Sequence, residues 1–97
     1  MMPIHELLAR IRWDSCFGRG SFVLGYIDHN TDELWFVPFR DVRPDPHNPS
    51  MLELVDKRGE MVSVPLHRIY QVSRNGKTIW QRELPPHVHA SFPNRQT

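Results

Sequence analysis

The stretch VPLHRIYQVSRNGKTIWQR, residues 64–82, has the pattern of two strands joined by Asn75-Gly76. Asn-Gly favours a two-residue type I′ turn, because both central residues of that turn need a positive φ. Such a turn fixes the register across the strands, which places Val72 opposite Ile79 and Gln71 opposite Trp80. The stretch therefore predicts a β-hairpin whose side chains alternate between two faces.

One face of this hairpin is expected on the core and the other in solvent. The core set, with Arg68 against Glu83 at its edge, is Leu66, Tyr70, Val72 and Ile79. The solvent set is His67, Ile69, Gln71, Trp80 and Arg82. There His67 is diagonal to Arg82 at about 7–8 Å, so both can contact one small anion. Since a guanidinium suits phosphate oxygens and an indole suits a stacked base, this face is a candidate RNA-binding surface.

The same side chains also fit a structural interpretation. Trp80 can pack under a helix, His67 can be a hydrogen-bonded structural residue, and Arg68 can pair with Glu83 or Asp28. The hairpin alone leaves both interpretations open.

The preceding residues predict one helix and more antiparallel strands. Apolar residues at positions 4, 7, 8 and 11 indicate an amphipathic helix over about residues 3–12. FVLGYIDH (22–29) and LWFVPF (34–39) are patterned as strands, and MLELVD (51–56) and MVSVPL (61–66) as a hairpin around KRGE. RPDPHNPS (43–50) contains three prolines, so no regular element is expected to cross it.

These elements predict an α+β fold, in which an N-terminal helix packs on a curled, mostly antiparallel sheet of about six strands. The hairpin that ends near Glu83 closes the sheet. Residues 1–84 are expected to form a single domain, since a chain of 97 residues has material for one modest core. Residues 85–97 contain three prolines and no periodicity, and we expect them to form a mobile tail.

Composition restricts the partners and the compartment. The formal net charge is only +1, whereas long-duplex binders are strongly basic, so a nucleic-acid contact should be small and local. Cys16 is the only cysteine, which excludes an internal disulfide framework and fits a reducing compartment. The N-terminal run has no apolar stretch long enough for a signal peptide or membrane span. We therefore expect a cytoplasmic protein without membrane contact, and its oligomeric state stays open.

Four segments of the chain follow the pattern of a known family. They are ELLARIRWD (6–14), LGYIDH (24–29) with VPF (37–39), VPLHRIYQV (64–72) and IWQRE (79–83). In this order and spacing they resemble the RNA cyclic-group-end recognition domain family, whose members are associated with RNA processing. The resemblance covers most of the chain. It implies a compact α+β module that recognises RNA ends carrying a cyclic phosphate, such as a 2′,3′-cyclic phosphate.

The resemblance also assigns residues, and it has two departures. Tyr26 and Asp28 match the family's Tyr-x-Asp, His67 and Arg68 its His-Arg-Ile, and Trp80 and Arg82 its Trp-x-Arg. His29 stands where an arginine usually follows the aspartate, and Gln81 stands where the family has an aspartate. The first departure replaces a permanent cation by an imidazole, which titrates near neutrality.

The expected function is recognition of RNA ends, without a cofactor. The residues predicted to bind RNA or phosphate are Tyr26, His29, His67, Arg68, Trp80 and Arg82, with Asp28, Arg12 and Asp14 in supporting positions. Asp14, the first residue beyond the helix, fits a loop-capping carboxylate equally well.

Two other classes stay open. A phosphoesterase acting on cyclic phosphate ends would use His67 as general base. An adaptor for an RNA-processing enzyme would use the neighbourhood of Trp35, Phe36 and Phe39. The pairs HNT (29–31) and HAS (89–91) resemble two-histidine phosphoesterase motifs, but they lie at a turn and in the tail instead of on buried strands. His87 and His89 alternate without a third ligand nearby, so no metal site is predicted.

Overall fold

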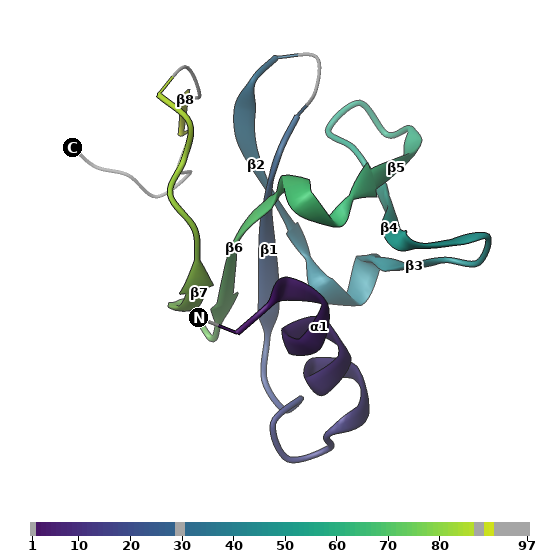
Figure 1. The fold of residues 1–97 in the computed structure, drawn as a ribbon, viewed down its shortest axis with the longest axis vertical. Coiled ribbons are helices and arrows are strands. Elements are labelled where there is room, and N and C mark those ends of the chain that lie inside the picture. The colour runs from purple at the N-terminus through teal and green to yellow at the C-terminus, as the bar shows by residue number, and fades with distance from the viewer. Residues whose placement is uncertain (1, 29–30, 87–88, 91–97) are drawn as a thin grey trace.

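A computed structural model describes residues 2–28, 31–86 and 89–90, which form one α-helix and two sheets (Figure 1). The strands are β1 (Phe22–Ile27), β2 (Glu33–Pro38), β3 (Arg43–Asp45), β4 (Asn48–Val55), β5 (Met61–Pro65), β6 (Ile69–Arg74), β7 (Lys77–Gln81) and β8 (His89–Ala90). The helix is α1 (Ile4–Trp13), and two 3₁₀ turns are η1 (Phe39–Asp41) and η2 (Leu66–Arg68). The α+β class is confirmed.

The strands divide between two sheets, so the expectation of one sheet of about six strands is wrong in this detail. The larger sheet has the order β7-β6-β1-β2-β8, and the smaller one the order β3-β4-β5. All pairings are antiparallel except that of β8, which runs parallel to β2. In Figure 1 the smaller sheet lies beside the larger one, and the chain between β5 and β6 links them through η2.

Helix α1 forms where the apolar spacing predicts it and ends one residue later, at Trp13. Its four apolar residues are all at most 8% exposed: Ile4, Leu7, Leu8 and Ile11. They join a core whose fully buried members come from both sheets: Leu24, Leu54, Ile69 and Val72. The helix and both sheets therefore share one hydrophobic core.

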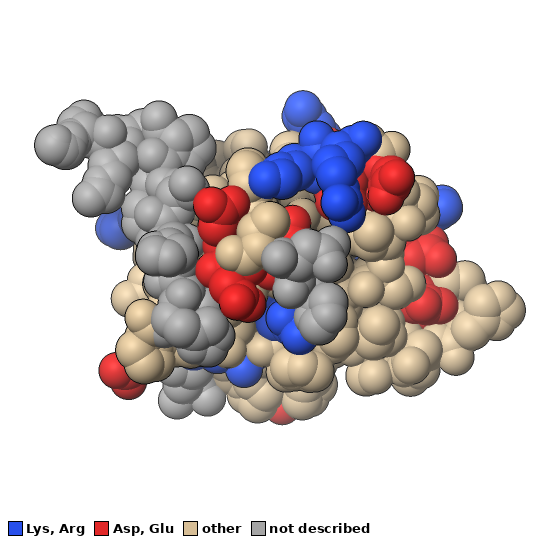
Figure 2. Space-filling view, turned by 90° about the horizontal axis from the view of Figure 1, so that it is seen from above, with Lys and Arg blue, Asp and Glu red and all other residues tan. Residues whose placement is uncertain are grey.

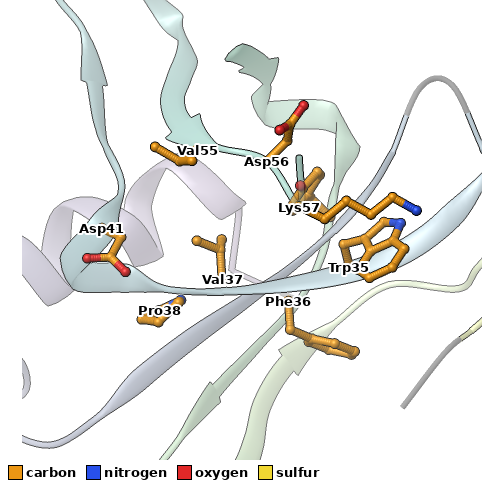
Figure 3. Close-up of a pocket in the computed structure, with 9 residues that line it drawn as sticks. Trp35, Phe36, Val37, Pro38, Asp41, Val55, Asp56 and Lys57 are labelled. Atoms are coloured by element: carbon orange, nitrogen blue, oxygen red, sulfur yellow. The ribbon is translucent and has the colours of Figure 1, made fainter. Parts of the chain in front are cut away.

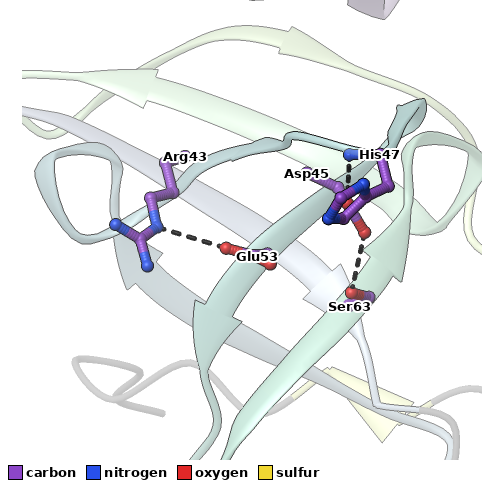
Figure 4. Close-up of polar contacts among 5 residues, drawn as sticks. All are labelled: Arg43, Asp45, His47, Glu53 and Ser63. Atoms are coloured by element: carbon purple, nitrogen blue, oxygen red, sulfur yellow. Dashed lines mark hydrogen bonds and ion pairs between the residues drawn. The ribbon is translucent and has the colours of Figure 1, made fainter.

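The proline-rich segment 43–50 forms β3 and the start of β4, which corrects the expected loop. Pro44 is tolerated because β3 is an edge strand, where a missing N–H costs no ladder hydrogen bond on the open side. Asp45 shapes the turn: its carboxylate accepts the His47 N–H at 2.9 Å and the Ser63 hydroxyl at 3.2 Å (Figure 4). The Asp45 carboxylate thus holds the turn between β3 and β4 and ties it to β5.

The hairpin of β6 and β7 has the expected turn but a different register. Asn75 and Gly76 have φ of 53° and 83°, as a type I′ turn requires. Pairing then slips by one residue, so that Val72 lies opposite Trp80 and Ile79 is bulged out. Trp80 is 7% exposed and Ile79 39% exposed, the reverse of the predicted faces.

The strand predicted through residues 64–74 is interrupted. Residues 66–68 form η2 between β5 and β6, and Ile69, which was expected on the solvent face, is fully buried. Of the predicted tail, His89–Ala90 form β8 beside Glu33–Leu34. Residues 87–88 and 91–97 lie outside the described residues. Among the described helices none is long and apolar enough to cross a membrane.

Candidate functional site

Two neighbouring clefts contain most of the predicted site residues. The inter-sheet cleft, of about 440 Å³, is lined by Tyr26, Ile27, Asp28, Met51, Asp56, Arg58, Val62, Ser63, Val64, Pro65 and Arg68. The histidine cleft, of about 520 Å³, is lined by Ile4, His5, Ser50, Met51, Pro65, Leu66, His67 and Arg82. Met51 and Pro65 are paired across β4 and β5 and line both clefts, so they form the ridge between them.

The 3₁₀ turn η2 sends two adjacent residues into different clefts. Pro65, with φ of −62°, stands at its N-terminal cap. A 3₁₀ helix has three residues per turn, so consecutive side chains point about 120° apart. His67 accordingly lines the histidine cleft and Arg68 the inter-sheet cleft. The predicted RNA-binding residues Tyr26 and Arg68 therefore line one cleft, and His67 and Arg82 line the other.

Arg82 is the fixed cation of the histidine cleft. Its guanidinium lies 5.3 Å from the ring centroid of Tyr70 and 5.1 Å from that of Trp80. Its backbone N–H donates to the Tyr70 carbonyl at 3.0 Å, which continues the sheet past the end of β7. Among the described residues its buried Nε has no hydrogen-bond partner. An unsatisfied donor on a charged group is costly, so the protein holds Arg82 in this position at a cost in stability.

Trp80 supports Arg82 from the core. Its indole N–H donates to the Met2 carbonyl at 2.7 Å, which ties the start of the chain to β7. Because this ring is buried and its donor is used, the predicted role as an exposed base-stacking platform does not agree with its position.

Tyr26 lies at the floor of the inter-sheet cleft and is 4% exposed. Burial raises the pKa of its phenol to about 12, and the negative charges of Asp28 and Asp56 act in the same direction. The hydroxyl therefore stays protonated at neutral pH, where it can donate a hydrogen bond as well as accept one.

The β4–β5 turn places a balanced pair of charges at the rim of the inter-sheet cleft. The Asp56 carboxylate accepts the Glu60 and Arg58 N–H groups, each at 2.9 Å, and lies 3.5 Å from the Arg58 guanidinium. The Glu60 N–H first, and then Arg58, hold the pKa of Asp56 below its usual range. Figure 2, which views this end of the molecule, shows basic and acidic side chains intermingled.

The remaining predicted residues lie elsewhere. Arg12 is exposed at the C-terminal end of α1, away from both clefts. Its guanidinium lies 5.0 Å from the centroid of the Phe39 ring. Asp14 caps a loop: it accepts the Phe17 and Cys16 N–H groups at 3.1 and 3.0 Å. These bonds, and weaker help from Arg10, hold the pKa of Asp14 below its usual range. His29 lies outside the described residues.

Sequence reasoning missed His5 and Ser50, which line the histidine cleft. His5 is on the polar side of α1, and nothing in the spacing of residues 3–12 connects it to His67. Ser50 lies within the segment that was expected to be a loop. Only the packing of α1 against η2 and β4 brings these side chains together.

A further cleft of about 440 Å³ lies between β2 and the β4–β5 turn (Figure 3). Lys57 covers part of it, with Nζ 4.1 Å from the Trp35 ring centroid and 3.9 Å from the Glu33 carboxylate. Trp35 Nε1 is buried without a partner among the described residues. Over the same residues, no group of three or more His, Cys, Asp or Glu side chains is arranged to hold a metal ion.

The fold and the two clefts define a small α+β protein with a cationic groove at the junction of its helix and sheets. Residues 1–82 match the family described as the MJ1316 RNA cyclic group end recognition domain. The chain belongs to this family, as its sequence motifs indicated. The comparisons with curated proteins and with solved structures found no match.

Proposed function

We propose that this protein binds RNA ends and that the terminal phosphate occupies the histidine cleft. The description of the family names RNA cyclic group end recognition, which supports RNA ends as the ligand class. The cleft supplies the donors that a phosphate needs: the Arg82 guanidinium, the imidazoles of His5 and His67, and the Ser50 hydroxyl.

The observation that carries this proposal is the sign of the charge in the cleft. None of the described residues lining it is acidic, and Arg82 takes part in no ion pair among the described residues. A phosphate that binds the N–H groups of the Arg82 guanidinium would therefore meet no opposing carboxylate.

The inter-sheet cleft suits the terminal base. Its walls include Ile27, Val62 and Val64, and its polar groups include the Tyr26 hydroxyl and the Asp28 and Asp56 carboxylates. Carboxylates accept hydrogen bonds from the amino and imino groups of a base, whereas they repel a phosphate. With the terminal ribose on the Met51–Pro65 ridge, its base would enter one cleft and its phosphate the other.

The test compares one short RNA with three 3′ ends: hydroxyl, linear phosphate and 2′,3′-cyclic phosphate. Dissociation constants are measured for the native protein, Arg82→Gln and His67→Ala. We expect the native protein to favour the phosphate-bearing ends, and each substitution to remove about 1.5–3 kcal/mol of that preference. Arg58→Gln, which removes a cation from the inter-sheet cleft, is the matched control and should leave the preference intact.

Asp28→Ala tests the inter-sheet cleft separately from the histidine cleft. It should weaken binding of all three RNAs by the same factor, because the base is common to them. Equal affinity for the three ends in the native protein, or an equal effect of Arg82→Gln on all three, would remove the phosphate from the histidine cleft. Thermal unfolding of each variant verifies that the fold is retained.

A second candidate function is opening of the cyclic phosphate, and the presence of His5 beside His67 in one cleft favours it. Water would attack phosphorus, one imidazole would accept its proton, and the other would protonate the leaving 2′ oxygen as the P–O2′ bond breaks. Incubation with 2′,3′-cyclic nucleotides should then yield the 3′-phosphate. A product that His5→Ala and His67→Ala each abolish would establish the reaction, and an unchanged substrate would leave recognition alone.

A further inference from the structure

A third cleft, of about 430 Å³, lies at the C-terminal end of α1, and we name it the helix-end cleft. Arg12 from α1 and Arg40 from η1 line it, and both are exposed. Apolar side chains, two glycines and Ser21 form the rest, so none of its described lining residues is acidic. Neither arginine takes part in an ion pair among the described residues.

Arg12 and Arg40 differ from several other cations of the described residues, among them Arg10 of α1, which pairs with Asp14. At the β1–β2 and β4–β5 turns, Lys57 pairs with Glu33 and Arg58 with Asp56. Helix α1 ends on the opposite side of the molecule in Figure 1, where Arg12 and Arg40 are without such partners. The C-terminus of a helix carries a partial negative charge, so an anion would bind here through these arginines and not through the helix.

Arg12 is oriented for this role by Phe39. Its guanidinium lies over the Phe39 ring at 5.0 Å. A cation–π contact of this kind restricts the rotation of the guanidinium without using its N–H donors in an ion pair. Such a guanidinium loses less entropy when it binds a phosphate than a freely rotating side chain would.

Trp13, beside Arg12, is 81% exposed, more than any other large apolar side chain that the structure describes. Trp13 does not itself line the cleft, but an indole left almost wholly in water one residue from Arg12 is a surface on which an unpaired base can stack. Trp80, in contrast, is buried, so the stacking role that the sequence suggested for it fits Trp13 better.

Helix α1 connects this cleft with the histidine cleft. His5 lines the latter and Arg12 the former, and residues seven apart lie on the same side of a helix, here about 10 Å apart along its axis. Ala9 lies between them on that side and is exposed. Its small side chain leaves room for an RNA strand to pass along the helix.

We infer that single-stranded RNA continues from the histidine cleft along the His5–Ala9–Arg12 side of α1, and that its backbone binds Arg12 and Arg40 with a base on Trp13. This placement of the RNA end rests on the proposed function, whereas binding at the helix-end cleft does not. The 3′ end then lies at the N-terminus of α1 and the 5′ side at its C-terminus.

A circular single-stranded RNA, which has no ends, tests the helix-end cleft alone. Its dissociation constant is measured for the native protein, for Arg12→Gln with Arg40→Gln, and for the control Arg43→Gln with Lys57→Gln, which removes equal charge from ion-paired positions. We expect the first pair to weaken binding about tenfold or more, and the control less than about twofold. The slope of log K against log salt should fall by about 1.4 in the first pair only, since each lost phosphate contact contributes about 0.7. Equal losses in both pairs would overturn the inference.

Trp13→Ala tests the stacked base. We expect at least about fivefold weaker binding of circular single-stranded RNA and no change in thermal stability, because the side chain is exposed. Unchanged affinity would refute stacking on Trp13. Equally tight binding of a duplex RNA by the native protein would refute it as well, because the paired bases of a duplex offer no free face.

Ala9→Glu tests the path along the helix, with Ala9→Gln as the control for size. Linear RNA that carries a cyclic phosphate end should bind several-fold more weakly to the Glu variant only, because a carboxylate would face the backbone. Equal effects of both substitutions would overturn the path. If the end chemistry makes no difference while Arg12→Gln with Arg40→Gln still weakens circular RNA, the proposed function fails and the helix-end cleft stands. If the end chemistry does affect binding but Arg12→Gln with Arg40→Gln leaves circular RNA binding unchanged, the proposed function stands and the helix-end cleft fails.

Discussion

The histidine cleft and the inter-sheet cleft lie on either side of the Met51–Pro65 ridge, but they differ in charge. Arg82, His5 and His67 line the first without any acidic neighbour among the described lining residues. In the second, two arginines face two aspartates. The number of arginines is greater in the cleft that is less suited to an anion. What distinguishes the anion site is therefore the absence of carboxylates, not the count of cations.

Each cleft also rests on a buried aromatic side chain, and these differ in what they do. Trp80 uses its N–H within the protein and forms a wall for Arg82. Tyr26 keeps a neutral hydroxyl at the floor of its cleft because its pKa is raised. The first ring is a structural support, while the second can contact a ligand.

Truncation of Trp80 gives the largest expected effect. Trp80→Ala should lower the free energy of unfolding by about 3–5 kcal/mol, because it empties a core position and leaves the Met2 carbonyl without its donor. Urea denaturation measures the loss. Trp13→Ala is the matched control and should change stability by no more than about 0.5 kcal/mol. Similar stabilities for the two variants would contradict the assignment of Trp80 to the core.

Alkaline pH should distinguish Tyr26 from a solvated tyrosine. Its folded-state pKa of about 12 is above the ordinary value of 10.0, so its contribution to stability is complete below pH 10 and is lost as the pH rises through about 12. Over this interval the native protein should lose about 1.4 kcal/mol per pH unit relative to Tyr26→Phe. Urea unfolding of both proteins at several pH values measures the difference. Parallel stability curves would show that the phenol is not buried in solution.

Adding a negative charge to the histidine cleft should have a smaller effect, in this case on RNA binding. Ser50→Asp introduces a carboxylate among His5, His67 and Arg82, and we expect it to weaken binding of phosphate-bearing RNA by about 1 kcal/mol or more. Ser50→Asn keeps the size without the charge and should bind as the native protein does. If the two variants bind alike, the absence of carboxylates is not what selects the phosphate.

Local patterns in the sequence predicted the elements well. The apolar spacing of α1 and the Asn75-Gly76 turn depend on neighbours in the chain, and both are as expected. The bulge at Ile79 is not local: it lets the larger ring of Trp80 reach the core in place of Ile79. A slip by one residue exchanges the faces of a strand, which is why the predicted solvent face was wrong.

The structure brings only some of the predicted site residues together, for the same reason. His67 and Arg82 line one cleft, as their shared face suggested, although the register that led to this was incorrect. His5 could not be found from the sequence, since its proximity to His67 depends on how α1 packs against η2. Segment 43–50 was missed because Pro44 lies on the edge strand β3 and Pro49 lies at a position of β4 that pairs with neither neighbouring strand, and both positions tolerate proline.

The smallest expected effect concerns the electrostatics of the inter-sheet cleft. Burial is the main reason for the raised pKa of Tyr26, and the charge of Asp28 is the next cause. Asp28→Asn should therefore lower the pKa of the phenol, but leave it above the ordinary value of 10.0. Ultraviolet titration of tyrosinate in a Tyr70→Phe background follows this single group. A return to the ordinary value would make charge, and not burial, the dominant cause of the raised pKa. The inter-sheet cleft would then differ from the histidine cleft by its carboxylates and not by the exclusion of water from Tyr26.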